Sequence, residues 1–227
     1  MRSYGQYCPV AKGAELIGDR WTLLIVRELL FGPLRFSEIE QGLPGISRSV
    51  LSERLRRLRR DGIIKQDQLG YSFTPAGEEL RPVIKSIGDW VARWIMNEPA
   101  RAELDPELLL LWISRHVRKE AVPRKRMVVE FRFLDLRSRR IWLVLDRNDV
   151  SVCLKHPGFE ADLYLTTRTR VLYRVYMGRT TLQDAVHAGD VELEGIPNLV
   201  RAFPTWMTWS HFAPTVHARL LLAAADS

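Results

Sequence analysis

The sequence has few cysteines, no long apolar run and none of the segments that direct a chain to a membrane. Its 227 residues include only Cys8 and Cys153, too few for a disulfide framework, so a reducing cytoplasm is the expected location. No apolar run approaches the roughly 20 residues that span a bilayer. The N-terminus also lacks the apolar core of a signal peptide. A membrane protein and a disulfide-rich secreted domain are therefore not expected.

Catalytic signatures are missing as well. The chain has no G-x-S-x-G, no P-loop and no dinucleotide-binding fingerprint. Asp184 and Asp190 flank His187, but surface charge explains them better than catalysis. The five histidines are scattered without the spacing of metal ligands: His116, His156, His187, His211 and His217. We therefore expect no enzyme, no cofactor and no metal site.

Positive charge is what the chain has in excess. Lys and Arg number 34 against 27 Asp and Glu, which gives a net charge of +7 and a pI near 9.7. An anionic partner is therefore expected. Hydrophobic residues make up 46% of the chain, enough to bury a core, and the length allows two domains of ordinary size.

The densest charge lies in ISRSVLSERLRRLRRDG, from Ile46 to Gly62. Leu51, Leu55 and Leu58 recur at the spacing of one buried helix face, so the arginines must lie on the other faces. Ser47 is the expected N-cap and Asp61-Gly62 the expected end of the helix. Taken alone, the run favours a solvated surface helix over a nucleic-acid site.

The surrounding elements favour the nucleic-acid interpretation. An apolar helix is expected over Trp21–Phe31, and a short helix opens at Ser37 with a capping-box pattern. The arginine-rich helix comes after a turn, and two short strands then form a hairpin around Leu69-Gly70. This order predicts a winged helix-turn-helix, in which the arginine-rich helix enters the major groove.

The same residues carry a family resemblance. The segment CPVAKGAELIGDRWTLLIVRELLFGPLRFSEIEQGLPGISRSVLSERLRRLRRDGIIK, continued by YSFTPAGEELRPVIKSIGDWVARW, resembles the HxlR-type regulators, a branch of the MarR-like winged-helix transcription factors. The resemblance implies a cytoplasmic homodimer on a pseudo-palindromic double-stranded DNA operator. The wing is shorter than in most relatives, which shifts the expected readout towards the recognition helix.

The first domain is expected to carry residues that contact base edges, residues that contact phosphates and residues that form a dimer interface. Base edges should be reached from the N-terminal end of the recognition helix, and phosphates from residues around it. Solvation alone would explain Arg35 equally well. The DNA-contacting set comprises Arg35, Ser37, Ser47, Arg48, Ser49, Ser52, Arg56, Arg57 and Lys65. The apolar stripe of the helix after the wing should form the dimer interface through Val83, Ile87, Trp90 and Trp94.

Cys8 matches a position at which some HxlR-type members sense oxidants or electrophiles. Such a thiol needs a helix N-terminus or a nearby cation, and Cys8-Pro9 begins a helix with Lys12 one turn further on. The alternative is a structural cysteine at the dimer interface.

A second domain is expected after a linker at 99–106. Alternating residues from Met127 to Phe133 predict a half-buried strand, and an apolar run from Ile141 to Leu145 predicts a covered one. Further strands and helices follow, up to a last amphipathic helix at Pro197–Phe203. The basic run at 115–126 suits either a longer DNA footprint or a solvated helix end. The expected fold is α+β, with a winged helix-turn-helix domain at 1–98 and an α/β sandwich-like domain with an antiparallel sheet at 107–227.

The stretch ADLYLTTRTRVLYRVYMGRTTLQDAVHAGDVELEGIPNLVRAFPTWM is similar to the lipid-binding domain of sterol carrier proteins. The resemblance implies an apolar tunnel for a small hydrophobic ligand between sheet and helices. Aromatic residues that could line it, or simply fill a core, are Trp142, Tyr173, Tyr176, Phe203 and Trp206.

Two classes of function remain in competition at this point. One is a homodimeric transcriptional regulator, expected to be a repressor, that responds to a hydrophobic ligand or to the redox state of Cys8. The other is a lipid-binding carrier whose basic surface meets acidic partners.

Overall fold

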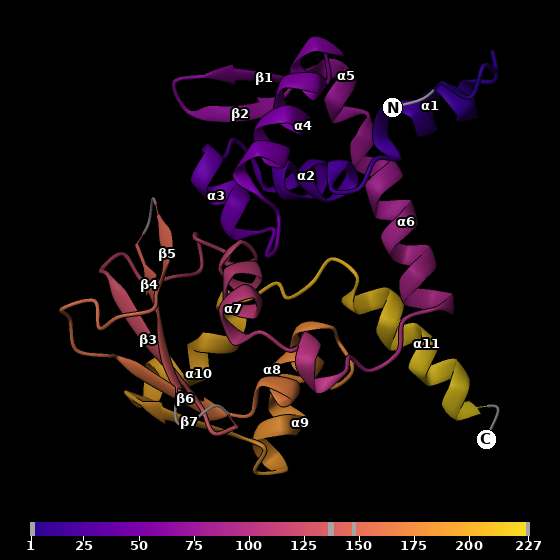
Figure 1. The fold of residues 1–227 in the computed structure, drawn as a ribbon. Helices are drawn as coiled ribbons and strands as arrows, with labels where there is room; N and C mark the ends of the chain where they lie inside the picture. The colour runs from indigo at the N-terminus through magenta and orange to yellow at the C-terminus, as the bar shows by residue number, and fades with distance from the viewer. Residues whose placement is uncertain (1–2, 136–138, 147–148, 226–227) are drawn as a thin grey trace. The chain divides into compact units, whose positions relative to one another are not determined.

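The chain folds into two compact units, Met1–Gly88 and Asp89–Ser227. The computed structural model describes residues 3–135, 139–146 and 149–225; Figure 1 traces the chain through both units.

Unit 1 is built from helices and one hairpin. The leucine stripe of the arginine-rich helix forms the centre of its core, where Leu51, Leu55 and Leu58 are buried together with Ile25 and Ile39. Its elements in chain order are α1 (Pro9–Ile17), α2 (Thr22–Glu28), the 3-10 helix η1 (Leu29–Phe31), α3 (Phe36–Gln41), α4 (Arg48–Arg60), β1 (Ile64–Asp67), β2 (Gly70–Phe73), α5 (Pro75–Glu78) and the first part of α6 (Leu80–Trp94).

Two predicted helices of unit 1 are interrupted. The apolar helix over 21–31 begins at Thr22, with Trp21 in the left-handed region at φ 78°, and tightens into η1 at Leu29. The helix expected from Pro75 onward breaks at Glu79, which ends α5 before α6 begins at Leu80. The capping box also lies two residues earlier than predicted, because the amide N–H of Arg35 donates to Glu38 Oε2 at 2.6 Å. Ser37 therefore lies inside α3.

Unit 2 contains a five-stranded sheet in the order β5-β4-β3-β6-β7. The strands are β3 (Met127–Phe133), β4 (Arg139–Leu145), β5 (Val150–Cys153), β6 (Leu163–Thr167) and β7 (Val191–Gly195). Three of the four pairs are antiparallel, as predicted, whereas the central pair of β3 and β6 is parallel. The prediction of a purely antiparallel sheet is therefore wrong for this one pair.

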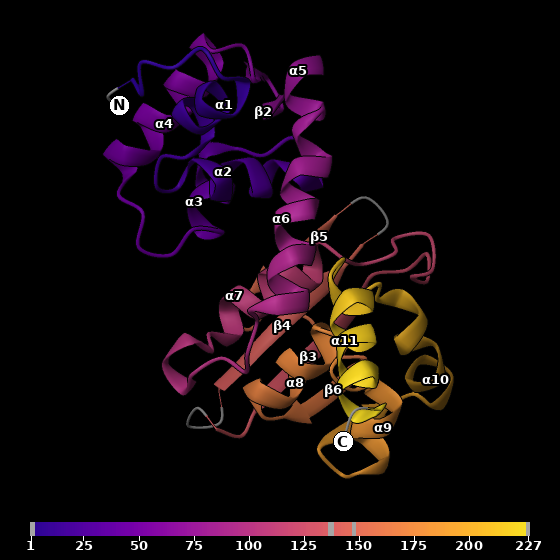
Figure 2. The ribbon, with the colours of Figure 1, turned by 90° about the vertical axis from the view of Figure 1, so that its right-hand side faces the viewer.

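Helices pack against one face of this sheet. Val129, Phe131 and Leu143 share a buried cluster with residues of the helices, and Figure 2 shows α8 and α11 in front of the strands. The helices of unit 2 are η2 (Arg101–Glu103), α7 (Pro106–Ser114), α8 (Thr169–Tyr176), α9 (Leu182–His187), α10 (Pro197–Trp206) and α11 (Ala213–Ala225). α7 ends well before Glu120, and α11 was not predicted.

The register of the sheet separates the aromatic residues that were expected to share one pocket. Trp142 pairs with Glu130, one residue out of step with the inward-facing Phe131, so its side chain lies on the opposite face of the sheet. There its indole Nε1 donates to Glu130 Oε2 at 3.2 Å. Phe203 and Trp206 are fully buried in the core. Phe203 and Trp206 thus fill the core, which is the alternative that the sequence left open, and they do not share one face of the sheet with Trp142.

Tyr173 and Tyr176 also lie in different surroundings. Tyr176 is buried and stacks on Trp112 with ring centroids 6.4 Å apart. Tyr173 borders an open cavity of about 440 Å³, together with Trp112 and the chain segment that follows α6. Of the five predicted ligand residues, Tyr173 is the one on the wall of this cavity.

The boundary between the units falls inside a helix. The division lies between Gly88 and Asp89, in the middle of α6, whereas the sequence suggested a linker at 99–106. α6 places Ile84 in the core of unit 1 and Ala92 in the core of unit 2. Both units therefore depend on this helix.

His116 is a buried titratable group in unit 2. Its Nδ1 lies 2.8 Å from the carbonyl oxygen of Trp112, and its ring is 4.7 Å from that of His211. Burial lowers the pKa of His116 below the ordinary 6.5, and the charges of His211 and Arg115 lower it further, against the hydrogen bond to Trp112, which raises it. The ring is therefore neutral in the folded protein at pH 7.

This pKa shift predicts a loss of stability in mild acid. As the pH falls through 6.5, the unfolded chain binds a proton at His116 that the folded chain refuses, so the free energy of unfolding decreases. Urea unfolding of the wild type between pH 7.5 and pH 5 should show this decrease, and His116→Gln should flatten it. His187→Gln, at an exposed position, serves as the control. Equal pH dependence in all three proteins would contradict the assignment.

Candidate DNA-binding site

The recognition helix α4 is fixed at its start and along one side. Ser47 is its N-cap, and its Oγ accepts a hydrogen bond from the amide of Val50 at 3.3 Å. The Oγ atoms of Ser47 and Ser49 are 3.1 Å apart. With the leucines turned into the core, Arg48, Ser49, Arg56 and neighbouring residues are left on the surface, and Ser52 is half-buried.

The turn before α4 packs on a buried carboxylate. Glu28 of α2 is fully buried and accepts hydrogen bonds from Arg27 Nε at 3.1 Å and Nη2 at 2.6 Å. The same Nη2 donates to the carbonyl oxygen of Gly42 at 3.1 Å. A Cβ on Gly42 would lie 1.7 Å from Glu28 Oε2, so any other residue at this position would have to displace the Glu28 carboxylate. This contact joins the turn after α3 to α2.

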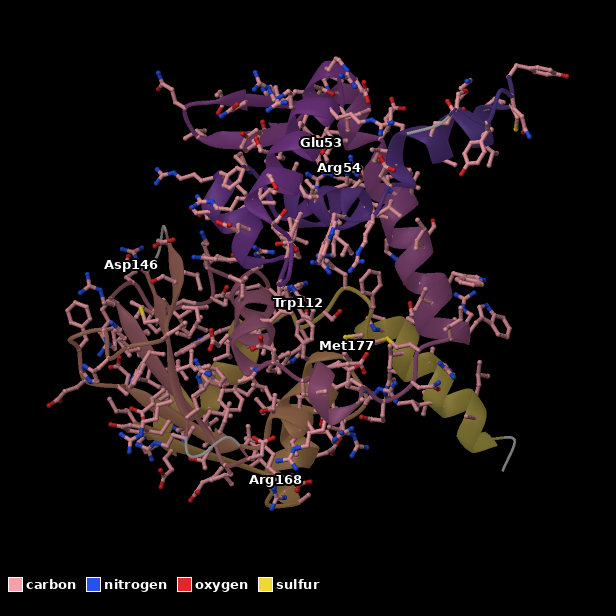
Figure 3. All side chains as sticks on the ribbon, viewed as in Figure 1. Glu53, Arg54, Trp112, Asp146, Arg168 and Met177 are labelled. Atoms are coloured by element: carbon pink, nitrogen blue, oxygen red, sulfur yellow. The ribbon has the colours of Figure 1, made fainter. Side chains whose placement is uncertain are left out.

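Two arginines of α4 are held by the domain itself. Arg57 Nη1 donates to Asp19 Oδ2 at 2.6 Å, and its Nη2 donates to the carbonyl oxygen of Glu15 at 2.5 Å. Arg54, which the sequence did not single out, lies 3.5 Å from Asp19 and 3.1 Å from Glu53 (Figure 3). Both arginine side chains are about one-fifth exposed. They tether α4 to the C-terminal end of α1, so Arg57 does not present its guanidinium as the sequence suggested.

The remaining arginines of α4 face outward. Arg48 is three-quarters exposed, with a 3.4 Å ion pair to Glu40 and its guanidinium 5.4 Å from the ring centre of Phe36. Arg56 is exposed. Arg59 donates to Gln66 Oε1 at 2.8 Å, and Arg60 lies 3.6 Å from Asp61. Cationic groups with loose or single contacts thus extend along one side of the helix.

The other predicted contact residues border this helix in unit 1. Arg35 and Ser37 are exposed at the start of α3, and Lys65 is exposed on β1. The wing between β1 and β2 is very short, because Asp67 pairs directly with Gly70. Asp67 Oδ1 accepts from the amide of Leu69 at 2.9 Å, which closes the turn. The tip residues Asp67, Gln68 and Leu69 carry no positive charge, so the tip offers little to a phosphate backbone.

Cys8 lies at the N-cap of α1 with its residue exposed. Lys12, the cation that the sequence suggested beside Cys8, forms an ion pair with Glu15 instead, with its Nζ 3.1 Å from Glu15 Oε2. Cys153 lies on β5 of unit 2 and is half-buried.

Among the described residues, no group of three or more His, Cys, Asp or Glu side chains is placed to hold a metal ion. Over the same residues, no helix combines the length and apolar character needed to cross a membrane.

The predicted dimer residues are exposed on α6. The exposed fractions are 40% for Val83, 43% for Ile87, 55% for Trp90 and 67% for Trp94. Their spacing places them along one side of the helix, opposite Ala92. Such large apolar side chains in a row are unusual on a surface that stays in water.

Comparison with known proteins agrees with this geometry. The family model described as HxlR-like helix-turn-helix matches residues 16–99. The chain is 41% identical over 98 residues to YvaP, an uncharacterized HTH-type transcriptional regulator of Bacillus subtilis (strain 168), and this match covers 40% of the chain and 91% of YvaP.

Two solved structures are among those to which the chain is similar. Quinone-bound YodB from B. subtilis is 35% identical, with a TM-score of 0.36, over 38% of this chain and 99% of YodB. The UbiJ-SCP2 ubiquinone synthesis protein is 16% identical, with a TM-score of 0.32, over 56% of this chain and 95% of its own. The family assignment rests on the sequence matches, which confirm the resemblance of the first hundred residues. The chain belongs to the HxlR-like helix-turn-helix family of transcriptional regulators.

Proposed function

We propose that the protein regulates transcription from the cytoplasm as a homodimer on a pseudo-palindromic operator, with one α4 helix in the major groove of each half-site. The observation that carries this proposal is the exposed side of α4, where Arg48, Ser49 and Arg56 remain available while the leucines and the tethered arginines hold the helix in place. Binding of a dimer across a promoter would block transcription, so repression is the expected outcome.

Base reading is assigned to the N-terminal end of α4. In helix-turn-helix proteins this end reaches base edges, and an arginine there can donate two hydrogen bonds to guanine. Arg48 suits this role because its side chain is three-quarters exposed and its one ion pair, to Glu40, is 3.4 Å long. Ser49 and Ser52 supply hydroxyls beside it. Arg56, Arg35 and Lys65 are assigned to phosphates, whereas Arg57 is left out because its donors are occupied within unit 1.

Operator binding should therefore respond differently to two arginine changes. Arg48→Ala should weaken specific binding by about 1–3 kcal/mol and relax selectivity at one base pair. Arg56→Ala should weaken binding to all sequences alike and reduce the salt slope by about 1. Fluorescence anisotropy on operator and scrambled duplexes at several salt concentrations measures both effects.

Arg201→Ala, on α10 of unit 2, is the control for lost charge, and its operator affinity should equal that of the wild type. Arg57→Ala should instead lower the melting temperature, because it leaves Asp19 without its shortest ion pair. Unchanged operator affinity in both Arg48→Ala and Arg56→Ala would show that α4 does not read DNA.

The exposed side of α6 supports the dimer. Val83, Ile87, Trp90 and Trp94 form an apolar stripe of the kind that helix pairs bury. A second copy would cover the same stripe through a two-fold axis, since such an interface is self-complementary. Two linked half-sites bind more tightly than one, so the dimer and operator affinity should be lost together.

Trp94→Glu tests this stripe. A carboxylate within an apolar interface would be buried without a partner, so the variant should sediment as a monomer and lose most of its operator affinity. Arg93→Gln changes charge by the same amount on a neighbouring face of α6 and should remain dimeric. Analytical ultracentrifugation at micromolar concentration, followed by anisotropy on full and half operators, gives both readouts. A wild-type monomer under these conditions would contradict the proposal.

Thiol sensing by Cys8 is a second candidate, favoured by its exposed position at a helix N-cap. If it operates, diamide should change operator affinity in the wild type by tenfold or more, and Cys8→Ser should abolish the change. Cys153→Ser should behave like the wild type. Identical affinities with and without diamide would remove the sensing role.

A further inference from the structure

A second cavity of about 310 Å³ lies within unit 2, beside the C-terminal end of α6. Its apolar wall comes from Ala92 and Met96 at the α6 end and from Val216 and Leu220 on α11. Two arginines, Arg179 and Arg219, also lie on the wall. An apolar cavity bordered by two guanidinium groups is an unusual combination, because burying a charge without a partner is costly.

Arg179 is held in a fixed position by the turn that carries it. The preceding Gly178 has φ +69° and packs on Ala213, where an added Cβ would lie 2.7 Å from the Ala213 carbonyl oxygen. Nη1 of Arg179 lies 3.5 Å from Glu98 Oε1, and Nη2 donates to the carbonyl oxygen of Met96 at 3.4 Å. Its Nε is buried and has no hydrogen-bond acceptor among the described residues. Contacts to Glu98 and to the Met96 carbonyl thus hold the guanidinium of Arg179 at the wall of the cavity.

Arg219 approaches the same point from α11. Its Nη1 donates to the carbonyl oxygens of Met96 at 2.8 Å and Ala92 at 3.3 Å. Arg179 and Arg219 thus share one acceptor, the Met96 carbonyl at the end of α6. Two guanidinium groups brought this close repel each other unless negative charge is nearby.

The available negative charge is insufficient. Glu98 is the one acidic residue on the wall of this cavity. Its carboxylate is shared among three arginines, with Arg170 at 3.4 Å and Arg174 and Arg179 at 3.5 Å. Three guanidinium groups around one carboxylate leave an excess of positive charge, and Arg219 adds to it. This local excess of positive charge favours an anion.

We infer that this cavity binds a small apolar monocarboxylate, whose carboxylate accepts from the guanidinium groups of Arg179 and Arg219 while its hydrocarbon part packs on Ala92, Val216 and Leu220. Arginine is suited to this task because its planar donors match a carboxylate. The volume stands at the lower end of the range of about 300–1,000 Å³ for small-molecule sites, which selects a small acid over a long lipid.

The larger cavity beside Tyr173 is a poorer site for an acid. Besides Glu98, which borders both cavities, its wall carries Glu103 and Asp105. These two further carboxylates would repel an anionic head group. Arg179 and Arg219 both border the smaller cavity, which is therefore the assigned site.

Occupation of this site would bear on α6. The Ala92 and Met96 carbonyls that Arg219 caps lie at the end of the helix that carries Trp90 and Trp94. An acid that binds one arrangement of this helix end better than another would shift the equilibrium between them. This regulatory consequence rests on the proposed function, whereas the binding site itself does not.

The test uses octanoate as the probe, on the full chain at pH 7.5 by isothermal titration calorimetry. Octan-1-ol is the neutral probe of equal chain length, and octylammonium is the probe of opposite charge. The wild type should bind octanoate at least tenfold more tightly than either. Arg219→Gln keeps hydrogen-bond donors but removes the charge, and it should lose this preference. Leu220→Trp fills the cavity and should reduce binding of octanoate and octan-1-ol alike, while Arg118→Gln, an exposed arginine away from the wall, should bind as the wild type does.

The circular dichroism and melting temperature of each variant establish that it is folded before binding is compared. Absence of octanoate binding, or equal octanoate binding by the wild type, Arg219→Gln and Leu220→Trp, would overturn the assignment. Operator affinity is measured on the same samples without octanoate. Loss of the proposed function would appear there, as a wild type that does not bind DNA, and is thereby distinguished from loss of the ligand site.

Discussion

The buried carboxylate of Glu28 is the constraint on which the helix-turn-helix depends. Burying a charge costs several kcal/mol unless hydrogen bonds satisfy it, and the Glu28 carboxylate is bonded to the guanidinium of Arg27. The same guanidinium reaches the Gly42 carbonyl, and Gly42 has no side chain to hold the turn away. Through these contacts α2 holds the turn that leads into α4. Arg48 and Ser49 at the start of α4 are exposed, while Leu51, Leu55 and Leu58 fill the core.

The arginines of α4 divide into a group that bonds within the domain and a group that is exposed. Arg54 and Arg57 turn back towards Asp19 and hold the helix on the domain, while Arg48 and Arg56 face water. A charge run in a sequence gives the total but not this division, which depends on where an acidic partner lies in the fold. Asp19 is 38 residues from Arg57 in the sequence, so their ion pair forms only because the fold brings the end of α1 against α4. The positive surface offered to DNA is correspondingly smaller than the count of arginines suggests.

Local patterns predicted much of the fold, and tertiary contacts explain most of the rest. The leucine period identified α4, and alternation identified β3, because both patterns report directly which face is buried. Trp142 was placed wrongly because a continuously apolar strand does not reveal which of its residues face the helices. The parallel pairing of β3 with β6 is likewise invisible in either strand alone. Among the candidate site residues, exposure of Arg48 and of the α6 stripe followed from periodicity, whereas the tether of Arg57 and the cavity at Arg179 depend on contacts between distant segments.

The sharing of α6 between two cores affects how the chain can come apart. A cut in the segment after α6 would leave Ala92 uncovered on the first fragment, and it would deprive Arg219 of the carbonyls that it caps on the second. A cut at Gly88 would divide the helix itself. The junction between the two units is thus part of the folded structure of each, unlike the exposed loops at which proteases usually separate domains. Each unit is therefore expected to lose part of its core when α6 unfolds, since Ile84 and Ala92 lie on the same helix.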